Sequence, residues 1–135
     1  MNSSADQVAT VYSRYLAEVA IQWKLPPADR RFEKMASLLT ERYASGQVNA
    51  FENELKGTIL VSARGITLES YHEVGVEAER VEIETCEVDE RNIVEAESKG
   101  PFLDVGGERS RRRIVGILIG SQWRIDSVSP SKGPC

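Results

Sequence analysis

The sequence has few of the side chains on which most enzymes and metal centres depend. Its 135 residues include one histidine and two cysteines. To act as a general base, His72 needs a partner and a cavity, and no motif places either beside it. One histidine and one cysteine pair leave no zinc site, and no Asp-rich loop has the spacing of calcium ligands. We therefore predict no catalytic residue, no bound metal and no cofactor.

Long apolar runs and nucleotide-binding loops are also missing. No stretch approaches the roughly 18 apolar residues of a membrane-spanning helix. Residues 1–6 lack the basic and apolar segments of a signal peptide. The glycines at 106–107 and 116–120 do not lead from a strand into a helix, which excludes a dinucleotide-binding fingerprint. A net charge of −4 argues against a nucleic-acid partner.

The remaining composition is that of an ordinary globular protein. Hydrophobic residues make up 41% of the chain and charged residues 28%, which is more apolar than disordered chains are. The length suits one hydrophobic core. Because no repeat, linker or low-complexity segment divides the sequence, we predict a single domain over residues 1–135.

Helical periodicity dominates the first half of the chain. Apolar residues recur at helical spacing over residues 6–24, where Val8, Tyr12 and Trp23 belong to one stripe. A second helix of about four turns is expected from Asp29 to a stop at Ser45-Gly46. A third, shorter helix is expected over residues 47–56.

From Gly57 onward the pattern becomes that of strands. The expected segments are 58–68 as one or two strands, 73–88 as one long strand, 93–98, 111–120 and 123–128, with a tight turn at 89–92 and a loop over 100–107. The apolar alternation slips once in the long strand, which predicts a β-bulge near Glu79-Arg80. Helices followed by an antiparallel meander predict an α+β fold with the helices on one face of a curved sheet.

The two cysteines, Cys86 and Cys135, are predicted to form one disulfide that holds the C-terminal tail on the sheet. Closing a loop of about 50 residues contributes roughly 4 kcal/mol in the chain-entropy account. Disulfides are typical of proteins outside the cytoplasm. Two explanations of the sequence start stay open, a cytosolic protein or an exported one whose signal segment is absent here. The cysteines favour the second, with an extracellular or cell-surface location and a possible membrane tether through that absent segment.

Charged residues gather in two parts of the strand region. Carboxylates concentrate over residues 73–97, and a later strand carries four arginines, Arg109, Arg111, Arg112 and Arg113. One interpretation is charge complementarity between neighbouring strands on an exposed sheet face. The other is a basic docking face for a protein partner or an anionic polymer.

Several short segments together resemble a known superfamily. They are the tyrosine-rich first helix (Val11-Tyr-Ser-Arg-Tyr-Leu), the strand from Val81 to Cys86, the arginine-rich strand, the final Trp123-Arg-Ile-Asp and the Gly-Pro-Cys ending. The chain resembles the nuclear transport factor 2-like superfamily, and within it secreted proteins and lipoproteins of actinobacteria. The resemblance implies a cystatin-like cone built of helices and a curved sheet. It also implies a possible homodimer through the sheet, and a cone mouth near Tyr12, Tyr43, Tyr71 and Asp104.

Together these observations predict a non-enzymatic exported domain. It is expected to bind a protein partner or a small ligand through the sheet face or the cone mouth. Two alternatives remain. One is a cone-pocket enzyme with isomerase-like or cyclase-like chemistry, which some members of the superfamily perform. The other is a scaffold domain of a secretion or conjugation apparatus.

Overall fold

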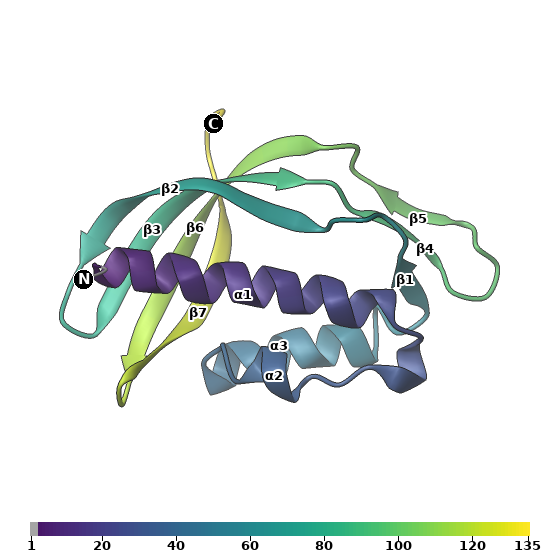
Figure 1. Ribbon diagram of the computed structural model, residues 1–135, viewed down its shortest axis with the longest axis horizontal. Helices are drawn as coiled ribbons and strands as arrows, with labels where there is room; N and C mark the ends of the chain where they lie inside the picture. Colours follow the sequence, from purple (N-terminus) through teal and green to yellow (C-terminus); the bar gives the residue numbers. More distant parts are fainter. Residues whose placement is uncertain (1–2) are drawn as a thin grey trace.

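A long helix lies under a curved antiparallel sheet in the computed structural model, which describes residues 3–135 (Figure 1). The helical segments are α1 (Ser4–Lys24), the 3-10 turn η1 (Pro27–Asp29), α2 (Glu33–Ala36) and α3 (Glu41–Glu52). The main sheet has the strand order β2-β3-β6-β7, and a smaller sheet has the order β1-β4-β5. The α+β class with helices on one face of an antiparallel sheet is therefore confirmed.

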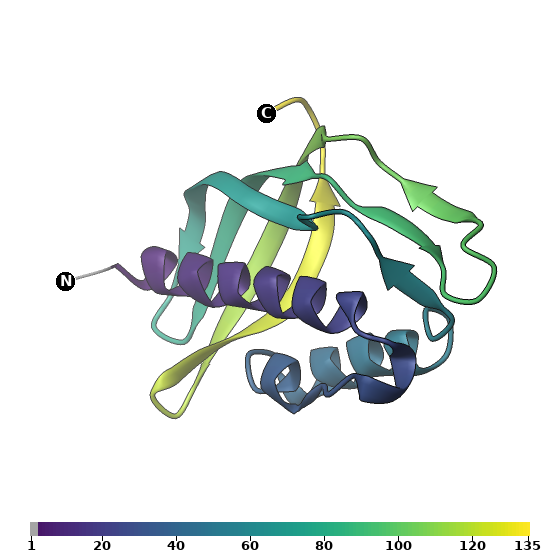
Figure 2. The same cartoon turned by 45° about the vertical axis from the view of Figure 1, so that its right-hand side comes forward.

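The strand bounds show how the chain passes between the two sheets. They are β1 (Thr58–Leu60), β2 (Ile66–Val76), β3 (Arg80–Asp89), β4 (Asn92–Glu95), β5 (Pro101–Asp104), β6 (Glu108–Ile119) and β7 (Gln122–Ser131). The two sheets curve around the helices, and the rotated view shows α1 crossing the hollow side of the main sheet (Figure 2).

Helix α1 confirms the predicted first helix and begins two residues earlier. The backbone N–H of Asp6 donates to the hydroxyl of Ser3 at 3.1 Å, and the backbone N–H of Ser3 donates to the Asp6 carboxylate at 3.3 Å. This reciprocal capping box satisfies two N–H groups that have no partner inside the helix.

The predicted second helix is wrong, because the chain leaves helical geometry before Thr40. The N–H of Thr40 donates to the carbonyl of Ile125 at 2.9 Å, and the N–H of Ile125 donates to the carbonyl of Leu38 at 2.9 Å. These bonds tie residues 38–40 to the edge of β7. A new helix, α3, then starts with Thr40 as its N-cap and continues through Ser45-Gly46. Pairing with a distant strand has overridden the local periodicity.

The predicted bulge at Glu79-Arg80 is also wrong, because the chain reverses there. The segment expected as one long strand is the hairpin of β2 and β3, closed by a bond of 2.8 Å from the N–H of Glu77 to the carbonyl of Arg80. The alternation slips because a new strand begins. Two register shifts do occur in β2, between Leu68 and Ser70 and between Glu73 and Gly75.

After β3 the chain crosses to the smaller sheet. The turn that follows Asp89 leads into β4, which pairs with β1 and β5. The expected return strand is therefore shorter and pairs elsewhere, and the expected loop over residues 100–107 contains β5.

Arg30 joins the end of α1 to the smaller sheet. Its side chain is buried at 5% exposure, and its guanidinium donates to the carbonyls of Trp23 and Thr58, the latter through a short bond. Burial lowers the pKa of this guanidinium. The carbonyl oxygens satisfy a cation that would otherwise be costly to bury.

The core lies between α1 and the hollow side of the main sheet. Its fully buried members include Val8, Tyr12, Met35, Leu39, Ile83, Ile114 and Ile125. The helix packs closely on the sheet at Gly116 of β6. A Cβ atom at Gly116 would lie 2.6 Å from Cγ2 of Val8, well inside van der Waals contact. Glycine is thus required at this position by packing.

Replacing Gly116 with alanine is expected to lower the free energy of unfolding by about 1–3 kcal/mol, because the added methyl pushes α1 away from the sheet. Urea unfolding of Gly116→Ala, Val8→Ala and the double variant measures the effect. The loss of unfolding free energy in the double variant should be smaller, by at least about 1 kcal/mol, than the sum of the losses in the two single variants. Strict additivity would contradict the close packing.

Candidate functional site

A continuous groove runs between helix α1 and strand β2. Two adjoining hollows, with volumes of about 340 and 560 Å³, make up this α1–β2 groove. Both are lined by Ser13, Ala17 and Leu68, so one continues into the other. At 1.5 Å per residue, the part of α1 from Asp6 to Lys24 extends about 27 Å. The groove therefore has the length of an extended segment of about eight residues.

Four small side chains form part of the helix side of the groove. Ala9, Ser13, Ala17 and Ala20 line it from α1, and Leu68 lines it from β2. Ile21 is 53% exposed at the same helix surface. Because the alanine and serine side chains are short, the space beside them is left for apolar side chains of another molecule.

One end of the groove carries negative charge. The hydroxyl of Tyr71 donates to the Asp6 carboxylate through a short bond that bridges β2 and the start of α1. This bond, with further bonds from Ser3, holds the pKa of Asp6 below its ordinary value. The same bond raises the pKa of the Tyr71 hydroxyl. Glu73 follows on β2, exposed to solvent.

The opposite end carries positive charge. Lys24, in the last turn of α1, donates from Nζ to the carbonyl of Ala63 at 2.6 Å. Arg64 lines the same end and is exposed, and within residues 3–135 its guanidinium takes part in no ion pair. Arg14, exposed near the middle of this part of α1, also lines the hollow that contains Asp6. The groove is thus acidic at the start of α1, carries one cation near its middle and is basic at its end.

Strand β2 offers one unpaired edge beside this groove. It pairs with β3 on one side, and no other strand of the described chain pairs with it. The opposite edge of the sheet, β7, is covered in part by residues 38–40. Exposed strand edges carry N–H and C=O groups that can pair with another chain. The two register shifts divide β2, so a partner strand pairs with it over short stretches.

Inside the cone, polar side chains bond to one another around Glu87. This carboxylate is fully buried and accepts from the hydroxyl of Tyr12 at 2.8 Å and from that of Thr85 through a short bond. Nε of Arg112 lies 3.6 Å from it. Burial, with the charge of Glu87 beside it, raises the pKa of Tyr12 above its ordinary value. We call these four residues the Glu87 cluster.

Of the four residues expected at a cone mouth, Tyr12 and Tyr43 both pack on Tyr15, and the other two lie elsewhere. Tyr12 is fully buried in the Glu87 cluster, and Tyr43 is half-buried beside Tyr15, with ring centroids 6.3 Å apart. Tyr71 is exposed at the acidic end of the α1–β2 groove. Asp104 is exposed at the end of β5 in the smaller sheet, opposite Asn92.

The four arginines of β6 divide between the two faces of the sheet. Arg112 belongs to the helix-covered face, where it meets Glu87. Arg109, Arg111 and Arg113 belong to the outer face, because successive side chains of a strand alternate. The run of arginines in the sequence is therefore not one basic surface.

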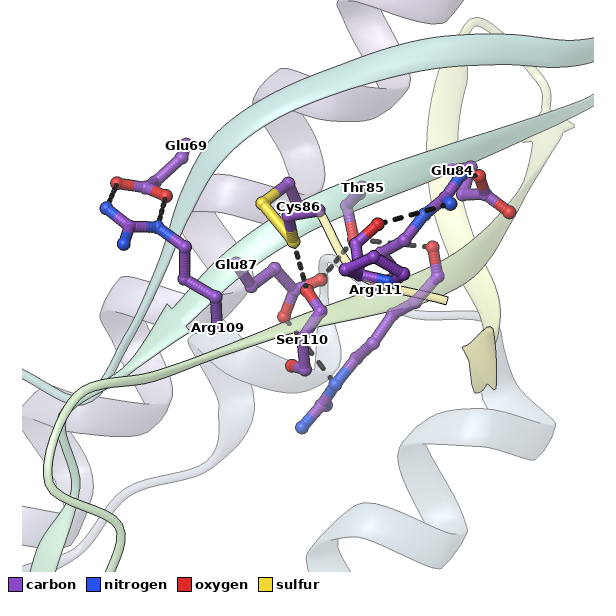
Figure 3. The surroundings of a disulfide bond; sticks show 11 residues. Glu69, Glu84, Thr85, Cys86, Glu87, Arg109, Ser110 and Arg111 are labelled. Carbon is purple, nitrogen blue, oxygen red and sulfur yellow. Dashed lines mark hydrogen bonds and ion pairs between the residues drawn. A yellow bond between two sulfur atoms is a disulfide. The ribbon is translucent and has the colours of Figure 1, made fainter. Parts of the chain in front are cut away.

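On the outer face, carboxylates of neighbouring strands accept from these arginines. Glu84 accepts from Arg111 through a short bond, and Glu69 accepts from Nε of Arg109 at 2.8 Å (Figure 3). Glu84 also accepts from Arg113 at 3.2 Å. Ser131 of β7 donates to the same Glu84 carboxylate at 2.6 Å. The geometry fits the interpretation of cross-strand charge complementarity better than that of a free basic face.

The predicted disulfide between Cys86 and Cys135 is confirmed. It joins β3 to the last residue across 49 positions of sequence, with the two Cα atoms 5.5 Å apart (Figure 3). The tail thereby lies on the outer face, where Arg111 also donates to the carbonyl of Pro134 at 3.4 Å.

Replacing Cys135 with serine is expected to lower the free energy of unfolding by about 2–4 kcal/mol, because the unfolded chain regains the freedom of a long loop. Urea unfolding with and without reductant provides the measurement. Reductant should destabilise the parent protein by a similar amount and leave the variant unchanged. Equal stability of parent and variant under oxidising conditions would contradict a stabilising role.

Within residues 3–135 no helix is both long and apolar enough to cross a membrane. In the same part of the chain, no three carboxylate, imidazole or thiol side chains are grouped as a metal site requires.

Comparison with known proteins shows the fold. No protein-family model and no curated protein matches the chain. Among solved structures, it is similar to the intermembrane space region of the chloroplast protein ARC6, with a TM-score of 0.61 and 14% identity, covering 97% of this chain and 100% of that one. A protein of unknown function with a cystatin-like fold from Nostoc punctiforme has a TM-score of 0.48 and 12% identity, covering 96% and 95%. At this identity the likeness extends to the fold and no further.

Proposed function

We propose that this chain is an exported, non-enzymatic binding domain that takes up an extended segment of a protein partner in the α1–β2 groove. The observation that carries the proposal is the position of the unpaired β2 edge directly beside that groove. A partner strand that pairs with β2 gains backbone hydrogen bonds, and its alternate side chains enter the groove.

The shape of the groove favours a strand over a compact ligand. It is open along its length, and alanine and serine side chains, among them Ser13 and Ala17, leave space on its helix side. Small-molecule sites are more enclosed and carry convergent polar groups. Exposed Val74 and Val76 extend the apolar surface of β2 beyond the groove.

The two surfaces expected from the sequence, the outer face of the sheet and the cone, are occupied by internal bonds. On the outer face, Glu84 and Glu69 neutralise the arginines. In the cone, the Tyr12 and Thr85 hydroxyls bond to Glu87. Groups that already bond to one another within the chain are available to a partner only if the partner breaks those bonds. The α1–β2 groove is therefore the surface that we propose for binding.

Export is supported by the disulfide between Cys86 and Cys135, because such bonds persist in oxidising compartments. The fold neighbour is named as an intermembrane space region, which is also outside the cytosol. We extend this to an extracellular or cell-surface location. The arrangement of α1 under a curved sheet is consistent with the nuclear transport factor 2-like superfamily, and we extend the proposal to its secreted members because of the disulfide.

A library of random nine-residue peptides, linked at their N-termini, tests the proposal. Selected peptides should bind the parent protein in fluorescence polarisation. They should bind the Ser13→Trp variant at least about tenfold more weakly, because its indole fills the centre of the groove. Ser45→Trp is the matched control, because Ser45 is also an exposed helical serine but lies on α3. Failure to select any peptide, or equal affinity for both tryptophan variants, would overturn the proposal.

A further inference from the structure

We propose that the α1–β2 groove selects its partner by the order of charges along the segment. The bound strand runs antiparallel to β2, with a basic side chain at its upstream end and an acidic side chain at its downstream end. This inference rests on the proposed function, since it specifies which segment the groove accepts.

The charges of the groove ends carry the inference. Asp6 lines the groove at the end where α1 begins, and Glu73 lies on β2 two residues beyond Tyr71, which lines the same end. Lys24 and Arg64 line the groove at the end where α1 stops. Within the described chain, neither Glu73 nor Arg64 belongs to an ion pair, so both remain available to a partner. The groove therefore presents opposite charges to the two ends of any segment that fills it.

The separation of the two ends lets them act independently. Ile66 and Glu73 lie about 23 Å apart along an extended strand. This distance exceeds the Debye length of about 8 Å at physiological salt. A charge at one end of a bound segment thus interacts with the nearer cluster only, and the two clusters together define a direction.

The direction follows from the pairing of the sheet. All pairings within the main sheet are antiparallel, and an antiparallel addition continues the hydrogen-bonding pattern that is slightly more stable per residue. Since β2 runs from the basic end to the acidic end, an antiparallel partner enters at Glu73 and leaves at Arg64. Its upstream residue meets carboxylates, and its downstream residue meets the two cations.

The test uses two peptides of identical composition. A peptide selected in the library experiment is made with Lys first and Glu last, and again with the two exchanged, both with blocked termini. At about 50 mM salt the Lys-first peptide should bind the parent protein about tenfold more tightly. At about 500 mM salt the preference should shrink, because the exposed charges are screened.

A charge-reversed protein provides the complementary arm. The double variant Arg64→Glu, Glu73→Lys should prefer the Glu-first peptide. The control pair Lys56→Glu, Glu54→Lys also preserves net charge, lies at exposed positions after α3, and should keep the parent preference.

The outcomes separate this inference from the proposed function. Equal affinity of the two peptides for the parent would overturn the charge selection while leaving groove binding intact. A preference of the parent for the Glu-first peptide would overturn the antiparallel direction. If both peptides bound Ser13→Trp as tightly as the parent protein, the proposed function would be overturned, and the inference with it.

Discussion

Replacing Glu87 with alanine is expected to lower the free energy of unfolding by about 3–5 kcal/mol, among the largest effects of any single change in this chain. The carboxylate is fully buried and accepts hydrogen bonds from Tyr12 and Thr85. Without it, the Tyr12 hydroxyl loses its acceptor, the Thr85 hydroxyl keeps only the carbonyl of Arg112 at 3.4 Å, and Arg112 loses its counter-charge. Chemical unfolding followed by tryptophan fluorescence gives the free energy.

Two further variants separate charge from hydrogen bonding at this position. Glu87→Gln keeps an acceptor for the hydroxyls and removes the charge, so its loss should be smaller than that of the alanine variant. Glu82→Ala removes a partly exposed carboxylate from the outer face of the same strand and should change stability by about 0.5 kcal/mol or less. A Glu87→Ala variant as stable as Glu82→Ala would contradict the description of the buried cluster.

Replacing Trp23 with alanine is expected to cost about 3–5 kcal/mol, because a large buried ring leaves a cavity. Trp23 is 4% exposed, packs edge-to-face on Phe51 with centroids 5.0 Å apart, and donates from Nε1 to the Thr58 hydroxyl at 2.9 Å. It therefore joins the end of α1 to α3 and to the smaller sheet. The unfolding midpoint in urea measures the loss.

The matched controls separate the ring from its N–H group and from the surface. Trp23→Phe retains most of the apolar contact and should lose about 1–2 kcal/mol. Phe102→Ala removes an aromatic ring that is 49% exposed on β5 and should lose about 1 kcal/mol or less. If Trp23→Ala unfolds no more easily than Phe102→Ala, then Trp23 does not join the helices to the smaller sheet.

The sequence predicted the features that depend on local pattern. The first helix and the last two strands came out nearly as expected, because strong periodicity and a glycine turn at residue 120 define them locally. The disulfide followed from the presence of two cysteines. The features it missed depend on distant contacts: Leu38 and Thr40 leave the helix to pair with β7, and a phase slip was interpreted as a bulge when it marked a hairpin.

The candidate site is harder to predict from the sequence than the fold is. Ser13, Ala17 and Leu68 carry no chemical signature, and only the packing of α1 against β2 makes them a groove. The charges at the groove ends come from separate segments and meet only in the fold. The arginines of β6 show the opposite case. They are neighbours in the sequence, but the pleat of the strand places them on two different faces of the sheet. An alternation count over residues 109–113 does reveal that division.

The central claim is that β2 and α1 together bind an extended segment. The most direct measurement is the change in backbone amide chemical shifts when a selected peptide is added to the labelled protein. The largest changes are expected along residues 66–73 of β2 and along the Ser13–Ala17 side of α1, with slower hydrogen exchange of the outward amides of β2. Changes concentrated at Tyr43 and Arg112 in the cone, or at Arg111 and Arg113 on the outer face, would contradict it.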